Sequence, residues 1–439
     1  MIMASELQNS ISVTKHWKQR CLLFFLGQRF LELDTFLPTA MELAMAHPEW
    51  RMRFIVFNEQ NYRAILANRI IMKGFESCGS LHFLGGGEGG WGMKIRRRLE
   101  GFAVITGWIL RRGRPVLFSS RAFSRGPYLL FSALARLRGG NSYLLWKNRS
   151  PDEVHRIIFQ VRELPEKESV SFLARIMGRD QDAVIYYHDQ QKKTLDEASA
   201  FGRIYDVPWV RIGMPHRFPA WRRFIDGQIE AERTRLAQEG VPQDAEIYTL
   251  FAAKPGSGSN YGLPGSIERT FKTIMTSLSR IRPDAMILIR AHPLAMDEPY
   301  IKECIEEAGG GRARMTLAHP EVLIALSHRC ITNNQTNILF TGFFGRLIDC
   351  GEYPEFHFKE HGEVSLAHGY GPLYINPLAK DFDARLARAL EDDSLFDAPE
   401  LTNKMEILHR NNPPRPDILL DLLDHGHPAK DSLVTFHGA

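Results

Sequence analysis

Short apolar runs that stop abruptly at glycine or polar residues constrain the fold of this chain more than any other feature. Clear examples lie at residues 21–27, 53–58, 247–253, 286–290 and 346–350. Runs that are apolar at every position are typical of parallel strands buried on both faces. Helical stretches separate them, and this strand, loop, helix, strand order predicts an α/β chain with doubly wound parallel sheets.

The chain has 439 residues, which is long for a single hydrophobic core. A charged helical stretch at 223–240 ends with Gly240, a helix-stop signal, and Pro242 follows. We place the domain boundary there. The expected organisation is a Rossmann-like acceptor-side domain at 1–240, a Rossmann-like nucleotide-donor domain at 241–400 and a C-terminal tail at 401–439.

Composition excludes several classes of protein. A hydrophobic content of 44% with 24% charged residues is that of an ordinary globular chain, and a net charge of +4 gives no reason to expect a nucleic-acid partner. The N-terminal twenty residues lack the apolar core of a signal peptide. Five scattered cysteines have no metal-ligand spacing and suit reduced thiols. We therefore expect a cytoplasmic protein.

Residues 94–125 are strongly basic, with Glu100 as the only acid among them. The apolar run GFAVITGWIL inside this segment is far shorter than the roughly 20 residues that span a bilayer. Two interpretations stay open. The segment is either a solvated basic face covering the first core, or a surface that docks on anionic lipid or on a lipid-linked acidic acceptor. The second interpretation places the chain at the inner face of the cytoplasmic membrane.

Polar clusters follow two expected strands of the second domain, one after 286–290 and one after 329–332. Ligands of open α/β sheets bind beyond the carboxyl ends of the strands, where helix N–H groups attract phosphate. We therefore predict an anion pocket for a nucleotide monophosphate or diphosphate. The predicted donor-binding residues are Arg290, His292, Pro293, Asn333, Asn334, Gln335, Thr336, Asn337 and Glu352.

Each of these predictions has a plainer structural alternative. The alternative for His292 is a residue that caps the next segment. The alternative for residues 333–337 is an ordinary helix N-cap. Glu352 is expected to contact donor ribose hydroxyls. The pair His319-Pro320 is not expected to lie at the end of a strand, unlike His292-Pro293.

Four stretches of the second half follow one another in a recognisable order. They are IYTLFAAKPG (247–256), Arg290 with His292 and Pro293, ALSHRCITNNQTN (325–337) and RLIDC (346–350). The first half adds DVPWVRIGMPH (206–216). Their order resembles GT-B glycosyltransferases of bacterial capsule and cell-surface polymer synthesis, a group that includes CDP-glycerol glycerophosphotransferases and CMP-sugar transferases. A Ser-Ser pair of that group is replaced here by residues 333–337, and its His-Gly by His216-Arg217.

The resemblance implies two Rossmann-like domains that face each other across a cleft. It also implies an enzyme that moves a sugar or polyol-phosphate unit from a nucleotide-activated donor to a cell-surface polysaccharide or lipid-linked acceptor. A cytidine nucleotide is slightly favoured as part of the donor substrate, and no separate cofactor is expected. No D-x-D run lies at the end of an expected strand to mark a metal site, and helix N-termini can stabilise the leaving phosphate, so we expect metal-independent catalysis.

Such a reaction needs a base for the acceptor hydroxyl. The candidates are His216, Asp189 and Asp226. His216 falls where the group has its N-terminal histidine, and an imidazole titrates near working pH. Asp226-Gly227 is similar to an acidic-Gly motif of CMP-sialic acid transferases, although a solvated helix face also explains it.

Two other functions stay open on the same fold. One is a UDP-sugar 2-epimerase, which would change the sugar without any acceptor. The other is a catalytically degenerate GT-B partner in polymer assembly, a hypothesis motivated by the altered Ser-Ser and His-Gly positions.

Overall fold

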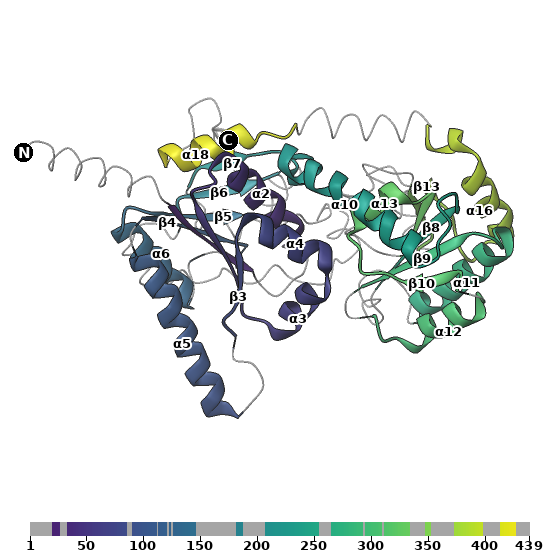
Figure 1. The fold of residues 1–439 in the computed structure, drawn as a ribbon, viewed down its shortest axis with the longest axis horizontal. Helices are drawn as coiled ribbons and strands as arrows, with labels where there is room; N and C mark the ends of the chain where they lie inside the picture. Colours follow the sequence, from purple (N-terminus) through teal and green to yellow (C-terminus); the bar gives the residue numbers. More distant parts are fainter. Residues whose placement is uncertain are drawn as a thin grey trace, which may run out of the picture.

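The computed structural model describes residues 20–26, 33–85, 90–111, 113–120, 123, 126–145, 181–187, 207–253, 265–292, 295–309, 311–333, 347–352, 373–397 and 413–426. Within these residues the chain forms two parallel sheets, one of seven strands and one of six (Figure 1). The prediction of two doubly wound α/β domains is therefore confirmed.

The first sheet has the strand order β3-β2-β1-β4-β5-β6-β7, and all neighbouring pairs are parallel. The strands are β1 (Arg20–Leu26), β2 (Arg51–Val56), β3 (Ser80–Phe83), β4 (Arg114–Ser119), β5 (Asn141–Leu145), β6 (Ala183–Tyr186) and β7 (Trp209–Arg211). The chain begins at the centre, winds to one side as far as β3 and then continues on the other side from β4. The order therefore reverses between β1 and β4, as in other doubly wound sheets.

The second sheet has the order β10-β9-β8-β11-β12-β13 and is also parallel. Its strands are β8 (Ile247–Ala252), β9 (Met286–Ala291), β10 (Ala313–Met315), β11 (Arg329–Asn333), β12 (Leu347–Asp349) and β13 (Leu373–Tyr374). Ala252 at the end of β8 pairs with Ala291 of β9 and with Asn333 of β11. The carboxyl ends of these three strands therefore lie level with one another at the switch point.

Helices cover both sheets. Those associated with the first sheet are α2 (Leu33–Ala46), α3 (Glu59–Ala67), α4 (Arg69–Cys78), α5 (Trp91–Leu110), α6 (Gly126–Leu137), the 3-10 turn η3 (Pro215–Arg217) and α18 (Pro416–His425). Helix α10 (Pro219–Gln238) connects the two sheets. Those of the second sheet are α11 (Ser266–Ile281), α12 (Pro299–Glu307), α13 (Pro320–Leu326), α16 (Phe382–Glu391) and η7 (Asp393–Phe396). Among the described helices, none is long and apolar enough to cross a membrane.

Strand β1 shows why its sequence is apolar at successive positions. Leu22 and Phe24 point into a core shared with α2 and α4, whereas Leu23 and Phe25 point into a second core with α5 and α6. Phe24 stacks on Phe118 of β4, with ring centroids 4.6 Å apart. Burying each such side chain stabilises the fold by about 1.5–3 kcal/mol, so both faces need apolar residues.

Helix α18 returns from the second half of the chain to the first domain (Figure 1). Its Leu419, Leu422 and Leu423 belong to the same core as β1 and α2. The backbone N–H of Arg415 donates to the carbonyl of Ile212 at 2.8 Å, just after β7. Part of the stretch that the sequence assigned to a C-terminal tail is therefore packed against the first domain.

Gly213 is the position where this returning segment approaches most closely. Its φ of 71° lies in the left-handed region that favours glycine. A Cβ added to Gly213 would lie 1.9 Å from the carbonyl oxygen of Pro413. Glycine is therefore required there both by backbone conformation and by space.

We expect Gly213→Ala to destabilise the chain more than Gly240→Ala does. Gly240 has a similar φ of 84°, but a Cβ added there would meet no described atom within 4 Å. Each variant should lose about 1–3 kcal/mol through backbone strain, and Gly213→Ala should lose more because Pro413 must move. Chemical unfolding of both variants measures the difference. Equal losses would show that the returning segment does not press on Gly213.

Candidate active site at the carboxyl edges of the sheets

The level ends of β8, β9 and β11 bring predicted donor-binding residues to one edge of the second sheet. His292 follows β9 directly, Asn333 ends β11, and Glu352 lies just beyond β12. Parallel strands that end together leave helix N-termini and connecting loops at that edge, which is where α/β sheets bind ligands. The strand pattern of the sequence predicts this common edge.

Asn333 is buried, and its amide is engaged in protein contacts. Its Oδ1 accepts from the backbone N–H of Ala253 at 3.0 Å. Its Nδ2 donates to the carbonyl of Ile267 at 3.1 Å and to Thr270 Oγ1 at 3.4 Å. The side chain therefore ties the end of β8 to the first turn of α11, and it positions this edge of the sheet.

Glu352 forms an ion pair with Arg269 of α11. Both carboxylate oxygens lie within 2.6 Å of Arg269 Nη2, and Arg269 Nε donates to Oε2 at 3.2 Å. The hydrogen bond and the charge of Glu352 raise the pKa of the exposed Arg269. Helix α11 begins after Gly265, which has a φ of 72° and gives the helix no side-chain cap. Asn333 and Glu352, which do not belong to α11, therefore hold its first turn in place.

Arg290 points under the loop that follows β10. Its Nε donates to the carbonyl of Ala318 at 3.1 Å, and its Nη1 donates to the carbonyl of Ala291 at 2.8 Å. The neighbouring His292 is held through its backbone, because its N–H donates to the carbonyl of Ala252 at 2.9 Å. Arg290 is buried and His292 is half-buried, so the two predicted phosphate ligands differ in their exposure to solvent.

The loop held by Arg290 leads to a buried carboxylate, Glu321, in the first turn of α13. Glu321 Oε1 accepts from His216 Nδ1 at 2.8 Å and from Trp221 Nε1 at 2.9 Å. Glu321 Oε2 accepts from Arg222 Nη1 at 3.3 Å. His216 lies in η3 after the first sheet, and the other two donors are in α10, so these bonds join the two sheets' carboxyl edges.

The charge state of Glu321 follows from these donors. Burial by itself raises the pKa of a carboxyl group, but here it is opposed by the hydrogen bond and charge of His216, with contributions from His319 and Trp221. The net effect holds the pKa of Glu321 below its usual range. An ionised carboxylate only accepts hydrogen bonds, so His216 must carry a proton on Nδ1.

The structure brings together some of the predicted site residues and separates others. Arg290 contacts the carbonyl of Ala318 and His216 contacts Glu321, three residues later, whereas Asn333 and Glu352 both contact the first turn of α11. Asp226 is exposed on α10, where Arg222 Nη2 lies 3.6 Å from its carboxylate. The remaining predicted residues lie outside the described ranges; they are Asp189, Pro293, Asn334, Gln335, Thr336 and Asn337.

Glu321 and its neighbour His319 are site residues that the sequence pattern did not predict. His319-Pro320 does not lie directly at a strand end, but β10 ends at Met315, only four residues earlier. Strand β10 contains only Ala, Arg and Met, which gives no apolar run to recognise. A usable signal did exist, since His-Pro-Glu is typical of a capped helix start; His319 caps α13 and accepts from Glu321 N–H at 3.3 Å.

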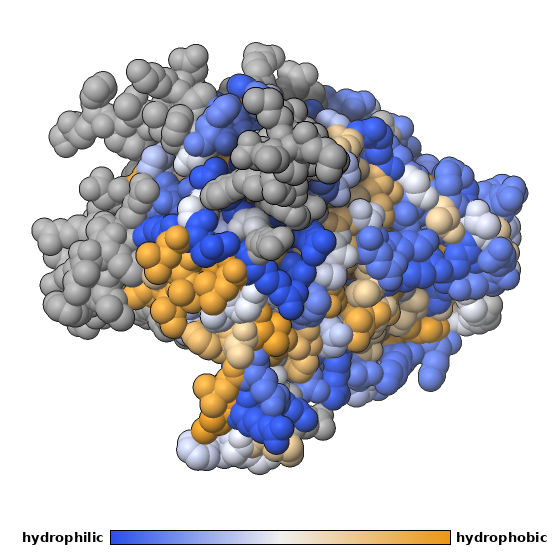
Figure 2. All heavy atoms as spheres, turned by 60° about the vertical axis from the view of Figure 1, so that its left-hand side comes forward, coloured by the Kyte–Doolittle hydropathy of each residue, from blue (hydrophilic) through white to orange (hydrophobic). Residues whose placement is uncertain are grey.

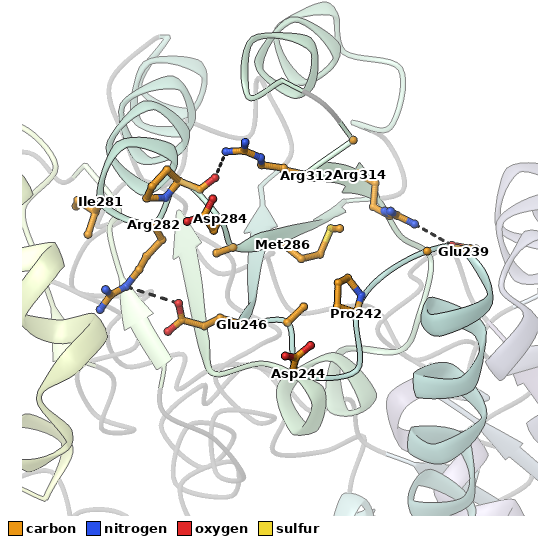
Figure 3. Close-up of a pocket in the computed structure, with 15 residues that line it drawn as sticks. Glu239, Pro242, Asp244, Glu246, Ile281, Arg282, Asp284, Met286, Arg312 and Arg314 are labelled. Atoms are coloured by element: carbon orange, nitrogen blue, oxygen red, sulfur yellow. Dashed lines mark hydrogen bonds and ion pairs between the residues drawn. The ribbon is translucent and has the colours of Figure 1, made fainter.

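A hollow of about 710 Å³ lies at the opposite edge of the second sheet (Figure 3). It surrounds the amino ends of β8, β9 and β10. Its arginines are already paired: Arg314 with Glu239 at 3.2 Å, Arg282 with Glu246 at 3.8 Å, and Arg312 with the carbonyl of Pro283. We therefore do not place the active site there.

Sequence comparison identifies no protein-family profile and no curated protein that matches this chain. Structural comparison does find similar folds. One is that of Staphylococcus aureus MnaA in a structure with UDP, with a TM-score of 0.50 and 10% identity over 93% of this chain and 96% of that chain. Another is that of a variant of the wall teichoic acid polymerase TagF, with a TM-score of 0.53 and 12% identity over 93% and 89%. The fold is GT-B.

Glu321 connects the carboxyl edges of the two sheets of this fold. The predicted fold class is confirmed, whereas membership of the capsule and teichoic acid group stays a prediction. Among the described residues, no group of three or more His, Cys, Asp or Glu side chains could hold a metal ion.

We expect Glu321→Gln to lower the apparent free energy of unfolding at neutral pH by about 3 kcal/mol. The substitution keeps the shape of the side chain but removes the buried charge that three donors surround. The matched control is Glu230→Gln. The exposed carboxylate of Glu230 pairs with Arg233, and its loss should lower the free energy of unfolding by at most about 1 kcal/mol. Chemical unfolding of the three proteins measures both effects.

The difference in unfolding free energy between the wild type and Glu321→Gln should depend on pH in a defined direction. Because folding lowers the pKa of Glu321, its stabilisation is complete above the ordinary carboxyl range and is lost as the pH falls through the lowered value. The difference between the wild type and Glu321→Gln should therefore shrink in acid. A difference that grows as the pH falls would contradict the ionised state of Glu321.

Proposed function

We propose that this chain is a nucleotide-sugar-dependent transferase. It moves a sugar or polyol-phosphate unit from a nucleotide-activated donor to a glycan or lipid-linked acceptor, without a metal ion. The observation that carries the proposal is the connection of Arg290, on the second sheet, to His216, after the first sheet, through the 316–321 loop. A cationic group and an imidazole are thereby held at facing carboxyl edges.

The second sheet supplies the groups for the leaving phosphate. Arg290 and His292 lie at the end of β9, and the first turn of α11 adds backbone N–H groups at the same edge. Preorganised positive and dipolar groups are effective because they need no reorientation when the charge develops. Asn333 and Glu352 are positioning residues in this proposal, since their side chains hold α11 in place.

His216 supplies the base. Because Nδ1–H is donated to the Glu321 carboxylate, Nε2 is the ring nitrogen that exchanges a proton with the acceptor: the ring takes the proton on Nε2 from its neutral form, and the Glu321 carboxylate stabilises the imidazolium that results. The imidazole is only 3% exposed, so an acceptor hydroxyl can reach it only when the two domains shift. Helix α10 contacts both α2 and α13 and is the element about which such a shift would occur.

The comparisons support a choice of nucleotides to test. MnaA was solved with UDP, which adds uridine nucleotides to the cytidine nucleotides that the sequence resemblance favours. The similarity to a wall teichoic acid polymerase supports an acceptor that belongs to a cell-surface polymer.

We expect one of CMP, CDP, UMP, UDP and GDP to raise the unfolding temperature selectively. A ligand at about 100 times its dissociation constant stabilises the folded chain by roughly 2.7 kcal/mol. His292→Ala should weaken that ligand at least about tenfold, because a charge-assisted contact to phosphate is lost. His328→Ala is the matched control, since His328 precedes β11 at the opposite edge and is exposed. Equal effects of the two variants would refute the proposed phosphate site.

Catalysis can be separated from binding with His216→Gln. We expect turnover with donor and acceptor to fall by about 10²–10⁴-fold, because the base is removed. Nucleotide affinity should stay within about twofold, since His216 belongs to the first domain. Measurement of nucleotide release and of nucleotide binding gives both values, and His328→Gln controls for loss of a histidine.

The product identifies the reaction. Nucleotide release that depends on an acceptor supports a transferase, whereas an epimerised sugar formed without acceptor would favour the UDP-sugar 2-epimerase. Failure to bind any nucleotide of the panel at millimolar concentration would favour a degenerate partner in polymer assembly.

A further inference from the structure

The first half of helix α5 projects from the first domain (Figure 1). The buried residues of α5 all lie in its second half, at Gly101, Ile105, Trp108 and Ile109. Residues 91–100, which we call the projecting half, are exposed except for the half-buried Ile95. Ten helical residues extend about 15 Å, so this half stands well clear of the sheet.

The projecting half carries large apolar side chains that are mostly exposed to solvent. Trp91 is 81% exposed, Leu99 64% and Met93 52%. Trp91, Ile95 and Leu99 are spaced by four residues and so lie along one side of the helix. Figure 2 shows apolar residues on this projecting helix and over the adjoining part of the first domain. Such an exposed apolar surface marks a docking site in soluble proteins.

The same half is strongly basic. Lys94, Arg96, Arg97 and Arg98 are exposed, and Glu100 is the only carboxylate, paired with Arg96 at 2.8 Å. Charged residues are depleted from the cores of protein interfaces, and two copies of this helix would repel each other. Interleaved basic and apolar side chains, with tryptophan among them, instead match the headgroup region of an anionic bilayer.

The structure separates the two halves of α5 within this basic segment, because the second half covers the first core through Ile105, Trp108 and Ile109. A solvated helix face would lie over the first core, but residues 91–100 contribute no buried residue to any core of the described structure. The apolar side chains of the projecting half therefore have no internal role among the described residues.

We propose that the projecting half of α5 docks the chain on an anionic lipid bilayer. Trp91 and Leu99 enter the headgroup region, while Lys94 and Arg98, which flank that side of the helix, lie against lipid phosphates. Helix α5 begins after β3, so docking holds the carboxyl edge of the first sheet next to the bilayer. An acceptor anchored in that bilayer is then close to the candidate active site. The docking itself does not depend on the reaction proposed above.

The test is cosedimentation of the full-length chain with lipid vesicles. We expect binding to phosphatidylcholine vesicles that contain about 30 mol % phosphatidylglycerol, and weak or no binding to pure phosphatidylcholine. Raising the salt from about 0.05 M to 0.5 M should release the chain, because salt screens exposed charges. Nucleotide and acceptor are omitted, so failure here would leave the proposed transferase untouched.

A pair of charge-matched variants locates the surface. Lys94→Gln with Arg98→Gln should weaken binding about 25-fold, from about fivefold for each charge lost near the membrane surface. The control is Arg385→Gln with Arg388→Gln, which removes two exposed charges from α16 on the second domain and should leave binding unchanged. Equal losses in the two variants would overturn the proposal.

Trp91 reports on insertion directly. Brominated lipids should quench part of the tryptophan fluorescence of the wild type, and this part should disappear in Trp91→Phe. Trp91→Ser should weaken vesicle binding on the order of tenfold, because an indole leaves the interface. The proposal is overturned if vesicles do not bind, if quenching is the same in Trp91→Phe, or if the chain self-associates in solution until Trp91 is replaced.

Discussion

The buried carboxylate of Glu321 is the interaction on which the arrangement of this chain depends. Removing a charge from water costs several kcal/mol unless charged and hydrogen-bonding partners surround it. Those partners are His216, Trp221 and Arg222, which come from η3 and α10 rather than from the second domain's own sheet. The carboxylate therefore stabilises one particular placement of the two sheets. It also sets the tautomer of the residue that we propose as the base.

Hydrogen bonds and an ion pair of polar side chains also hold the carboxyl edge of the second sheet. Asn333 joins β8 to α11, Glu352 holds α11 through Arg269, and Arg290 holds the loop that leads to Glu321. Polar residues that the sequence predicted as phosphate ligands thus also support the frame around the site. Catalysis by positioned charges requires such a frame, because the groups must already be oriented when charge develops.

The first domain is covered asymmetrically. One face of its sheet lies under α2, α4 and the returning helix α18, and the other lies under α5 and α6. Helix α5 is longer than the sheet it covers, which leaves its first half without a core to pack against. That surplus length carries both the apolar and the basic residues of the proposed membrane-docking surface. Membrane attachment and catalysis are thereby assigned to the same edge of the first sheet, on different elements.

The sequence by itself determined the fold class and the edge at which Arg290, His292, Asn333 and Glu352 gather. A strand buried on both faces must be apolar at every position, and parallel strands must end at a common edge, so local patterns are sufficient. Short strands such as β3 and β10 escaped prediction because three or four mixed residues form no pattern. Only the tertiary structure decided the partner of His216 and the packing of α18. Glu321 is 105 positions away from His216, and no local pattern specifies a contact between side chains so far apart in the chain.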